Sequence, residues 1–267
     1  GVLWAVGMPG IMKSTDGGLN WTRVNISLVP YPGGDYVVAQ TYRDFVRNVT
    51  VLSDNSVLVT VPFYSLGIWG YAYTNVYKTT DGGTTWSILF TQKYVDMVTM
   101  VEANDKAVVF TDQSGRIYRF VQGVVTNVFI GDPRNMTAGP FLKTNNGALY
   151  YALNEEKKFR GVIEVVPVIY RSDNHGVTWS EVGNLPPGNS FIDTGDIFTE
   201  SSDGRLYVVT YTDCWKGTIY QSSNQGKKWD VASGNPSGLN YFSTAIEEIG
   251  GEIVHSSGHG GIIFTIP

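Results

Sequence analysis

The sequence predicts an all-β fold built from a repeated unit of four antiparallel strands. The first observation behind this prediction is a motif that occurs four times with fixed internal spacing. The second is composition: the 267 residues include 31 Gly and 16 Tyr, and 16% are charged, against about 25% in an average soluble domain. The third is that no stretch keeps the apolar period of a substantial helix. Together they indicate strands joined by tight turns.

The motif places Ser or Thr first, Asp or Asn third, Gly fifth and Trp eighth. We call its four copies the repeat turns: 14–21, 79–86, 172–179 and 222–229. The acidic or amide side chain can accept hydrogen bonds from backbone N–H groups ahead of it. Glycine at the fifth position permits a positive φ, and the tryptophan can bury its indole against the sheet. We therefore predict a structural role, as hairpin turns with a hydrophobic anchor, for Ser14, Asp16, Gly18, Trp21, Thr79, Asp81, Gly83, Trp86, Ser172, Asn174, Gly176, Trp179, Ser222, Asn224, Gly226 and Trp229.

Apolar segments on either side of the repeat turns give the strand order. The unit is strand A, a polar turn, strand B, a loop, strand C, the repeat turn and strand D. Strand B is expected at 3–6, 57–61, 148–152 and 206–210, and strand A at 45–52, 139–143 and 196–200. Two further units, near 105–130 and 240–267, have no repeat turn. The first unit starts at strand B and the last ends at strand C.

The repeated motif resembles the Asp-box (BNR) repeat of sialidases and related β-propellers. This resemblance implies that each four-stranded unit is one blade of a ring. Six units share 267 residues (267/6, about 44 each), which is the usual length of blade repeats. We therefore expect one β-propeller over residues 1–267 with six blades, five to seven also being compatible.

Several classes of function are disfavoured. Cys214 is the single cysteine, which excludes an intrachain disulfide and a cysteine-ligated zinc site. No apolar run is long enough to cross a bilayer. A net charge of −5 without a basic block disfavours nucleic-acid binding. His255 and His259 are separated by a predicted turn, and His175 lies in a repeat turn, so no metal is expected. Glycine-rich stretches precede strands, so no phosphate-binding cofactor is expected either.

Strand order predicts where a ligand would bind. The A–B turns and the repeat turns fall on one face of a blade, and the B–C loops and D–A connections fall on the other. Loops on a rigid scaffold commonly carry function, and three long B–C loops are expected at 62–75, 154–167 and 212–217. Their aromatic residues can stack on sugars or anchor a protein partner; the alternative is that they fold inward as small cores. The candidate binding residues are Tyr31, Tyr64, Trp69, Tyr71, Tyr73 and Trp215.

The catalytic pattern of sialidases does not carry over. The resemblance would imply an arginine triad, a Tyr–Glu nucleophile pair and an acid–base Asp. Residues 1–13 contain no arginine, so the Arg-Ile-Pro-type motif that precedes the first box in sialidases is absent. No catalytic residue is assigned. A glycoside hydrolase of another kind, with two facing carboxylates at the propeller mouth, stays the alternative. Acids placed near that face are Asp35, Asp44, Asp96, Asp193, Asp196 and Asp213.

The expected function is a non-catalytic binding or assembly module, secreted or on a cell or virion surface. Its loop face would meet a glycan or a protein, within a larger extracellular assembly. Four N-x-S/T sequons occur, at Asn20, Asn25, Asn48 and Asn135, and Asn20 is the poorest acceptor because it lies in a repeat turn. A third possibility is kinship with photosystem-assembly or sorting-receptor propellers, which also implies protein binding but differs in blade number or length.

Overall fold

A computed structural model describes the backbone of most of the chain. The described residues are 1–7, 10–26, 46–64, 71–93, 97–128, 136–159, 161–186, 190–192, 197–212, 217–232, 243–249, 251–257 and 263–266. Within these ranges the chain forms strands and turns and no helix, and therefore no helix able to span a membrane.

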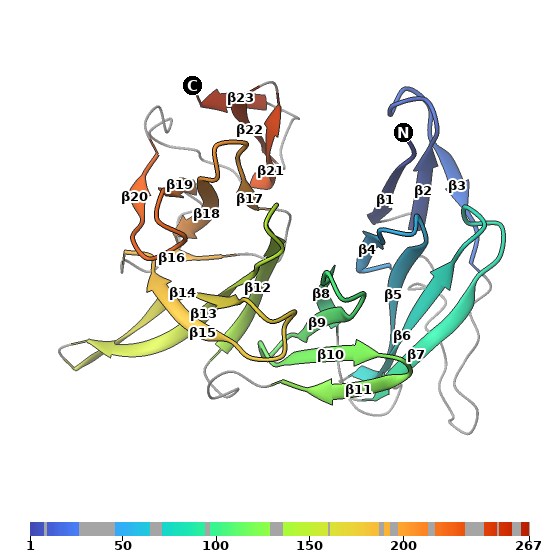
Figure 1. Cartoon of the computed structure of the whole chain (residues 1–267), viewed down its shortest axis with the longest axis horizontal. Coiled ribbons are helices and arrows are strands. Elements are labelled where there is room, and N and C mark those ends of the chain that lie inside the picture. The colour runs from blue at the N-terminus through green and yellow to red at the C-terminus, as the bar shows by residue number, and fades with distance from the viewer. Residues whose placement is uncertain are drawn as a thin grey trace. The chain divides into compact units, whose positions relative to one another are not determined.

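The strands form six antiparallel sheets (Figure 1). The first contains β1 (Leu3–Gly7), β2 (Gly10–Ser14) and β3 (Thr22–Val24). The second contains β4 (Asn48–Val51), β5 (Val57–Tyr64), β6 (Tyr71–Thr79) and β7 (Ser87–Lys93). The third contains β8 (Met97–Glu102), β9 (Val108–Asp112), β10 (Ile117–Val121) and β11 (Val124–Asn127).

The remaining three sheets follow in chain order. The fourth contains β12 (Met136–Lys143), β13 (Leu149–Phe159), β14 (Val162–Ser172) and β15 (Ser180–Asn184). The fifth contains β16 (Ser190–Phe191), β17 (Phe198–Glu200), β18 (Leu206–Thr212), β19 (Gly217–Ser222) and β20 (Asp230–Val231). The sixth contains β21 (Ser243–Ile249), β22 (Glu252–Ser257) and β23 (Ile263–Ile266).

Spatial order follows chain order, so the sheets are meanders, except that β16 and β17 of the fifth sheet both pair with β18. The second and fourth sheets have the orders β4-β5-β6-β7 and β12-β13-β14-β15, which are the predicted strands A, B, C and D. The all-β class and the four-stranded antiparallel unit are therefore confirmed. The count of six blades stays a prediction, because two of the six sheets have three strands each in the described part of the chain and are not complete units.

The chain divides into two compact units, each with its own apolar core. The first comprises Gly1–Glu102 and Val121–Val124, and the second comprises Ala103–Phe120 and Val125–Pro267. In the second unit every residue of β18 from Leu206 to Tyr211 is buried. In the first, the same holds for β5 from Val57 to Phe63. A strand that is covered on both faces needs consecutive apolar residues rather than alternation. The prediction of one domain over 1–267 stays a prediction.

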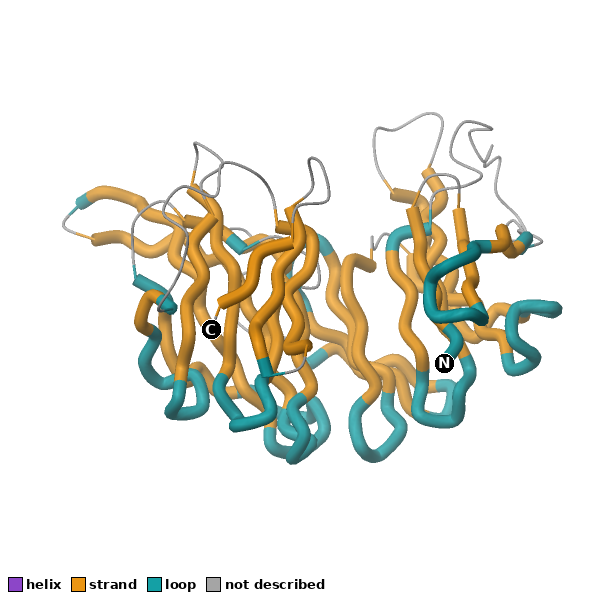
Figure 2. The backbone as a smooth tube through the Cα atoms, turned by 90° about the horizontal axis from the view of Figure 1, so that it is seen from above, coloured by secondary structure: helices purple, strands orange, loops and turns teal. Residues whose placement is uncertain are grey.

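The A–B turns form a second repeat, with four copies in the described part of the chain. The turns are 52–56, 103–107, 144–148 and 201–205. In each, an Asp or Asn accepts the backbone N–H two residues later, at 2.9, 3.2, 3.0 and 3.2 Å. The next residue has a φ of 63° to 86°; these residues are Asn55, Lys106, Gly147 and Gly204. Figure 2 shows such turns in teal at the ends of the orange strands.

Two expected B–C loops are largely strand, which corrects the prediction for 62–75 and 154–167. Pairing of β5 with β6 continues through Phe63↔Tyr73 to Tyr64↔Tyr71. Pairing of β13 with β14 continues through Lys157↔Glu164 to Phe159↔Val162. Both hairpins therefore extend the sheet where the sequence, with its charged and aromatic residues, indicated irregular loop.

Candidate functional site

The four repeat turns share one set of four hydrogen bonds. The first residue's Oγ accepts the N–H of the fifth at 2.8 to 2.9 Å and donates to the third residue's Oδ1 at 2.8 to 3.0 Å. That Oδ1 accepts the N–H of the seventh residue at 2.9 Å. The tryptophan Nε1 donates to the carbonyl of the fifth residue at 2.9 to 3.1 Å. These four bonds involve the first, third, fifth and eighth residues, which are the fixed residues of the motif.

Two consecutive residues of each repeat turn adopt left-handed backbone. The fifth residue is Gly18, Gly83, Gly176 or Gly226, with φ of 95°, 92°, 80° and 82°. The fourth residue is also left-handed, and in two turns it is His175 or Gln225 rather than glycine. Arg119 Nε donates to the His175 carbonyl at 3.1 Å. His175 therefore has a structural position in the turn, as its left-handed fourth residue.

Most of the predicted binding aromatics lie outside the described side chains. Tyr31, Trp69 and Trp215 lie outside the described residues, and Tyr64 and Tyr71 are described only as strand backbone. Tyr73 is 2% exposed, and its ring stacks on Phe63 at 4.6 Å between centroids. The prediction that Tyr73 sits on an exposed loop is wrong, because pairing continues past it and turns its ring into the core; for this residue the inward-packing alternative holds.

The structure does not describe the side chains of the predicted acids, of Cys214, or of His255 and His259. Asp35, Asp44, Asp96, Asp193, Asp196 and Asp213 all lie outside the described residues, as do Cys214 and His259, and the His255 side chain is not described. Within the described ranges, no group of three or more His, Cys, Asp or Glu side chains converges on a point that could hold a metal ion.

One acid that the sequence analysis missed lies in a B–C turn. Asp112 is 4% exposed, and its carboxylate accepts the Arg116 N–H at 3.0 Å and the Tyr118 hydroxyl at 3.1 Å. Burial raises the pKa of Asp112, although these hydrogen bonds oppose the shift. Burial also raises the pKa of Tyr118, with the Asp112 charge adding to the effect. The Tyr118 ring stacks on the Phe110 ring, with 5.2 Å between the ring centroids. The Asp112 carboxyl thus links the two ends of this turn through its bonds to Arg116 and Tyr118.

The most prominent described feature on the B–C side is the end of the β13–β14 hairpin. Pairing of β12 with β13 ends at Met136↔Glu155, and pairing of β15 with β14 ends at Val168↔Asn184. Residues 156–159 and 162–166 therefore run past the described ends of both neighbouring strands, as Figure 1 shows. We call these residues the arm. Ile163 on the arm is 64% exposed, and Glu156 and Lys158 are exposed as well.

The base of the arm is fixed by polar contacts. Tyr170 donates its hydroxyl hydrogen to Glu155, and Lys157 Nζ lies 3.7 Å from Glu155 and 3.6 Å from Glu181. Burial first and Glu155 second raise the pKa of Tyr170, so this phenol stays protonated. On the other side, buried Asn154 donates to the Ile192 carbonyl at 2.7 Å and accepts the Ile192 N–H at 2.8 Å. These contacts tie the hairpin to Glu181 and Ile192 at the point where it leaves the sheet.

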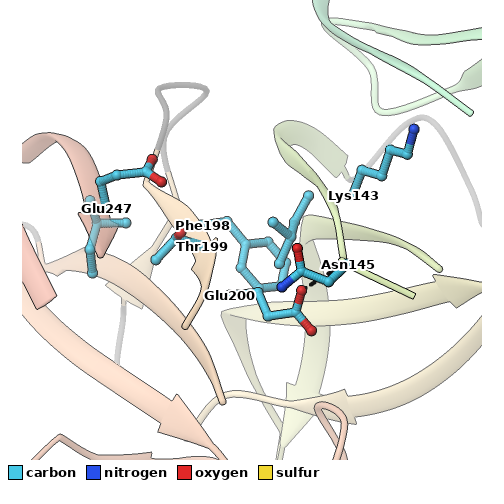
Figure 3. Close-up of a pocket in the computed structure, with 8 residues that line it drawn as sticks. Lys143, Asn145, Phe198, Thr199, Glu200 and Glu247 are labelled. Carbon is cyan, nitrogen blue, oxygen red and sulfur yellow. Dashed lines mark hydrogen bonds between the residues drawn. The ribbon is translucent and has the colours of Figure 1, made fainter. Parts of the chain in front are cut away.

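A pocket of about 390 Å³ lies at the opposite, A–B turn end of three sheets. Figure 3 shows Glu200 joined by a hydrogen bond to Asn145, while the Lys143 ammonium group points away from them. The Asn145 N–H donates to Glu200 Oε2 at 2.6 Å, so one of the pocket's carboxylates is already engaged. The lining residues are Leu142, Lys143, Asn145, Phe198, Thr199, Glu200, Ile246 and Glu247.

The bond between Glu200 and the neighbouring turn recurs elsewhere. Glu102 accepts the Ser53 N–H at 2.7 Å, and Glu248 accepts the Ser202 N–H at 2.7 Å. Each of these glutamates lies at or near the end of a strand A and caps the A–B turn of the preceding sheet. We call these contacts the glutamate clasps. The pocket carboxylate of Glu200 is thus part of a structural repeat.

The sequons differ in their surroundings. Asn25 is exposed, whereas Asn48 lies in β4 and accepts the Thr50 hydroxyl at 3.0 Å within its own sequon. Asn20 donates its amide to Asp16 at 2.7 Å, and Asn135 lies outside the described residues. Asn20 and Asn25 are both exposed, but the Asn20 amide is engaged by Asp16.

Comparison with known proteins identifies the architecture. No protein-family model matches the sequence, and no curated protein sequence matches it. A structure of YCF48 bound to D1 peptide matches with a TM-score of 0.58 and 16% identity, covering 98% of this chain and 73% of that one. An ancestral GH74 enzyme matches with a TM-score of 0.61 and 13% identity, covering 97% and 33%. The chain is a β-propeller.

A Trypanosoma rangeli sialidase matches this propeller with a TM-score of 0.52 and 16% identity, covering 81% of this chain and 44% of that one. The propeller therefore spans about a third of the GH74 chain and less than half of the sialidase chain. At identities this low, the structural similarity shows a shared fold alone.

Proposed function

We propose that this propeller is a non-catalytic binding module that binds a protein partner on its B–C side. The arm provides the strand edge to which the partner docks. The observation that carries the proposal is that residues 156–159 and 162–166 run past the described ends of both neighbouring strands with exposed Ile163 at their end. A hairpin whose edges are unpaired within the described residues is a template for an added strand. The repeat turns, which we propose to be Asp-boxes, support the scaffold from the opposite face. A glycan remains the other ligand class of the predicted aromatic loops.

The YCF48 structure contains a peptide, which is compatible with a protein partner for a propeller of this size. We propose an extracellular or surface location within a larger assembly. Asn25 is then the acceptor that we expect to carry a glycan when the chain is secreted from a glycosylating host. Site-resolved mass spectrometry tests this, and glycan on Asn48 with none on Asn25 would contradict it.

The binding proposal is tested with two exposed isoleucines as a matched pair. Ile163 is 64% exposed on the arm, and Ile249 is 62% exposed at the end of β21. Binders are selected from a displayed peptide library and, separately, from a glycan array. Ile163→Asp should weaken the selected peptides at least tenfold, because it places a charge in the apolar contact, and Ile249→Asp should not. Equal effects of both variants, or binders from the glycan array alone, would contradict a protein-docking arm.

The second candidate function is a glycoside hydrolase, and one observation favours it. Burial raises the pKa of Asp112 on the B–C side, which is the property of a general acid in such enzymes. A panel of aryl glycosides tests this candidate directly. Hydrolysis by the wild type that is lost in Asp112→Asn, with the fold intact, would contradict the binding proposal and support the hydrolase. If no glycoside of the panel is hydrolysed, the hydrolase candidate is rejected.

A further inference from the structure

One glutamate clasp differs from the other two in the residue that it meets. In the clasps of Glu102 and Glu248, a serine donates both its N–H and its hydroxyl, so both carboxylate oxygens are bonded. The third clasp has Asn145 at the place of the serine, and only the N–H of Asn145 donates, to Glu200 Oε2. Within the described residues, Glu200 Oε1 therefore has no hydrogen-bond donor.

The pocket of about 390 Å³ that Glu200 lines contains further polar groups without partners. Thr199 is 5% exposed, and its hydroxyl makes no hydrogen bond in the part of the chain that the structure describes. The Asn145 side-chain amide has none there either. Figure 3 shows Thr199 between Glu247 and Glu200. Because a buried hydroxyl without a partner is costly in free energy, a ligand that bonds Thr199 removes that cost.

The rest of the pocket wall is apolar. Phe198 and Ile246 are buried, and Leu142 packs against the core cluster to which both belong. These three residues come from β12, β17 and β21, so the wall is shared by three successive sheets of the second unit. A ligand with a polar end and an apolar stem suits a lining of this kind.

The charges of the lining favour a cation. Two carboxylates, Glu200 and Glu247, and one ammonium group, Lys143, line the pocket. The Lys143 ammonium group points away from Glu200 and Asn145 in Figure 3, and it forms no ion pair with any described residue. Lys143 therefore does not neutralise Glu200, and the pocket keeps an excess of negative charge.

The available acceptors decide which cation fits. A calcium ion takes about six to eight oxygen ligands, and no group of three or more His, Cys, Asp or Glu converges on a point within the described ranges. A guanidinium pairs best with both oxygens of a carboxylate, but Glu200 Oε2 is already bonded to Asn145. A primary ammonium group has three donors and needs no such fork. Its donors match Glu200 Oε1, the Thr199 hydroxyl and the amide oxygen of Asn145.

We propose that this pocket binds a primary alkylammonium group, of the kind that a lysine side chain or a free diamine carries. The ammonium group donates to Glu200, Thr199 and Asn145, and its methylene stem lies along Leu142, Phe198 and Ile246. The site lies at the A–B turn end of the sheets, whereas the arm lies at the B–C end. The proposal therefore does not depend on the proposed function.

The lysines of residues 1–267 do not supply this group. All of them except Lys216 lie in the described ranges, and among those only Lys143 lines the pocket. Lys216 directly precedes β19 at the B–C end of the fifth sheet. The length of β18 separates that end from the A–B turn by about 20 Å. The ammonium group therefore comes from outside these 267 residues.

The binding experiment uses Nα-acetyl-lysine methylamide as the probe. It is titrated into the whole chain at millimolar concentration, and the backbone amide signals of residues 143–145 and 198–200 are followed by NMR. Two analogues are titrated in parallel: the norleucine compound, which has the stem without the ammonium group, and the arginine compound. The lysine probe should shift these signals and saturate, and both analogues should bind about tenfold more weakly, because each loses a charge-assisted bond.

Variants of the pocket assign the contacts. Glu200→Gln keeps an acceptor for the Asn145 N–H but loses the charge, and it should weaken the lysine probe about tenfold. Glu248→Gln is the matched control, because it alters a clasp that does not line the pocket, and it should leave binding unchanged. Thr199→Val, nearly the same shape, should weaken binding about threefold and tests the site independently of any clasp. Lys143→Gln should tighten binding, since it removes a like charge.

The source of the ammonium group is assigned by comparing the lysine probe with 1,5-diaminopentane. Tighter binding of the diamine would assign a free diamine as the ligand, and tighter binding of the lysine probe would assign a lysine side chain. Three results would overturn the proposal. These are equal binding of the lysine and norleucine compounds, equal losses in Glu200→Gln and Glu248→Gln, and binding of Nα-acetyl-glutamate methylamide in preference to the lysine probe.

Discussion

Asp81 and Asn174 occupy the same position in two repeat turns but bond their neighbours differently. Asp81 accepts the Thr85 hydroxyl at 2.6 Å, whereas the Asn174 amide donates to the Thr178 hydroxyl at 2.8 Å. Both accept the backbone N–H of that threonine at 2.9 Å. A threonine hydroxyl can donate or accept, so it fits either partner. The Asp turn therefore titrates and the Asn turn does not.

These hydrogen bonds hold carboxylate pKa values low. The Thr85 hydroxyl and N–H lower the pKa of Asp81, and the Asn20 N–H and amide lower the pKa of Asp16 to about 2. A group whose folded pKa is depressed contributes stability that is present above its unfolded pKa, about 3.9. That contribution is lost as pH falls through the folded pKa. The acid limb of stability should therefore begin near pH 4.

We predict that Asp81→Asn flattens this acid limb. At pH 7 the variant should unfold at nearly the wild-type urea midpoint, since Thr85 can accept from the new amide as Thr178 does from Asn174. Between pH 4 and pH 2 its midpoint should fall less than that of the wild type. Urea titrations across this range make the measurement, with Glu252→Gln, an exposed carboxylate outside the turns, as control. Parallel acid limbs for Asp81→Asn and wild type would contradict the assignment.

Gly176 and Gly204 separate backbone strain from crowding. Both have a φ of 80°. A Cβ on Gly176 would lie 2.7 Å from Val109 Cγ2, whereas a Cβ on Gly204 would meet nothing within 4 Å. Left-handed backbone costs an L-residue about 1–2 kcal/mol, and overpacking adds about 1–3 kcal/mol.

We therefore predict that Gly204→Ala lowers the free energy of unfolding by about 1–2 kcal/mol. Gly176→Ala should lower it by a further ~1–3 kcal/mol, because Val109 must move. Equilibrium urea unfolding of both variants gives the difference. Equal losses would show that the neighbouring strand accommodates the methyl group, and that close packing is not what requires glycine at the fifth position.

At the scale of elements, the glutamate clasps tie a strand A to the turn of the sheet before it. Glu248 accepts both the N–H and the hydroxyl of Ser202, at 2.7 and 2.8 Å. Glu252 on the next strand is exposed and provides a matched carboxylate. Because the clasp is partly solvated, its contribution to the free energy of unfolding is limited to about 1 kcal/mol.

We predict that Glu248→Ala lowers the free energy of unfolding by about 1 kcal/mol, while Glu252→Ala changes it by less than about 0.5 kcal/mol. Hydrogen exchange should localise the effect to the 201–205 turn. The prediction fails when both variants unfold alike, or when the Ser202 amide exchanges at the wild-type rate in Glu248→Ala.

Element boundaries at the B–C ends were the part of the fold that sequence reasoning missed. Consecutive charges from Glu155 to Lys158 indicate a solvated loop, yet these residues continue β13. Tertiary contacts compensate for their polarity: Tyr170 bonds Glu155, and Lys157 lies between Glu155 and Glu181. Alternation within a hairpin sends successive side chains to opposite faces, so a run of charges can be shared between two surfaces without breaking the strand.

The candidate site was predicted less completely than the scaffold. Tyr73 was expected on a surface loop, and its burial follows from pairing with Phe63, which local composition does not reveal. Asp112 was missed because an isolated acid before a glycine-containing turn has no distinctive spacing. Its raised pKa comes from burial, which no motif or charge pattern in the surrounding sequence indicates.

At the scale of the whole molecule, thiol chemistry yields a prediction from the sequence itself. One cysteine cannot form an intrachain disulfide. The Tm should therefore be unchanged by a reductant, and Cys214→Ser should have the same Tm with or without it. Calorimetry under both conditions makes the comparison. A reductant-dependent Tm in the wild type alone would reveal an intermolecular bond through Cys214.

The sequence by itself determined the all-β class, the meander of four strands and the composition of the repeat turns. It could do so because those turns are local: the four hydrogen bonds that every copy shares lie within eight consecutive residues. Only the tertiary structure decided how far each hairpin extends and which acids are buried. These depend on what a neighbouring strand or sheet places against a residue, and that neighbour is set by pairing between segments far apart in the chain.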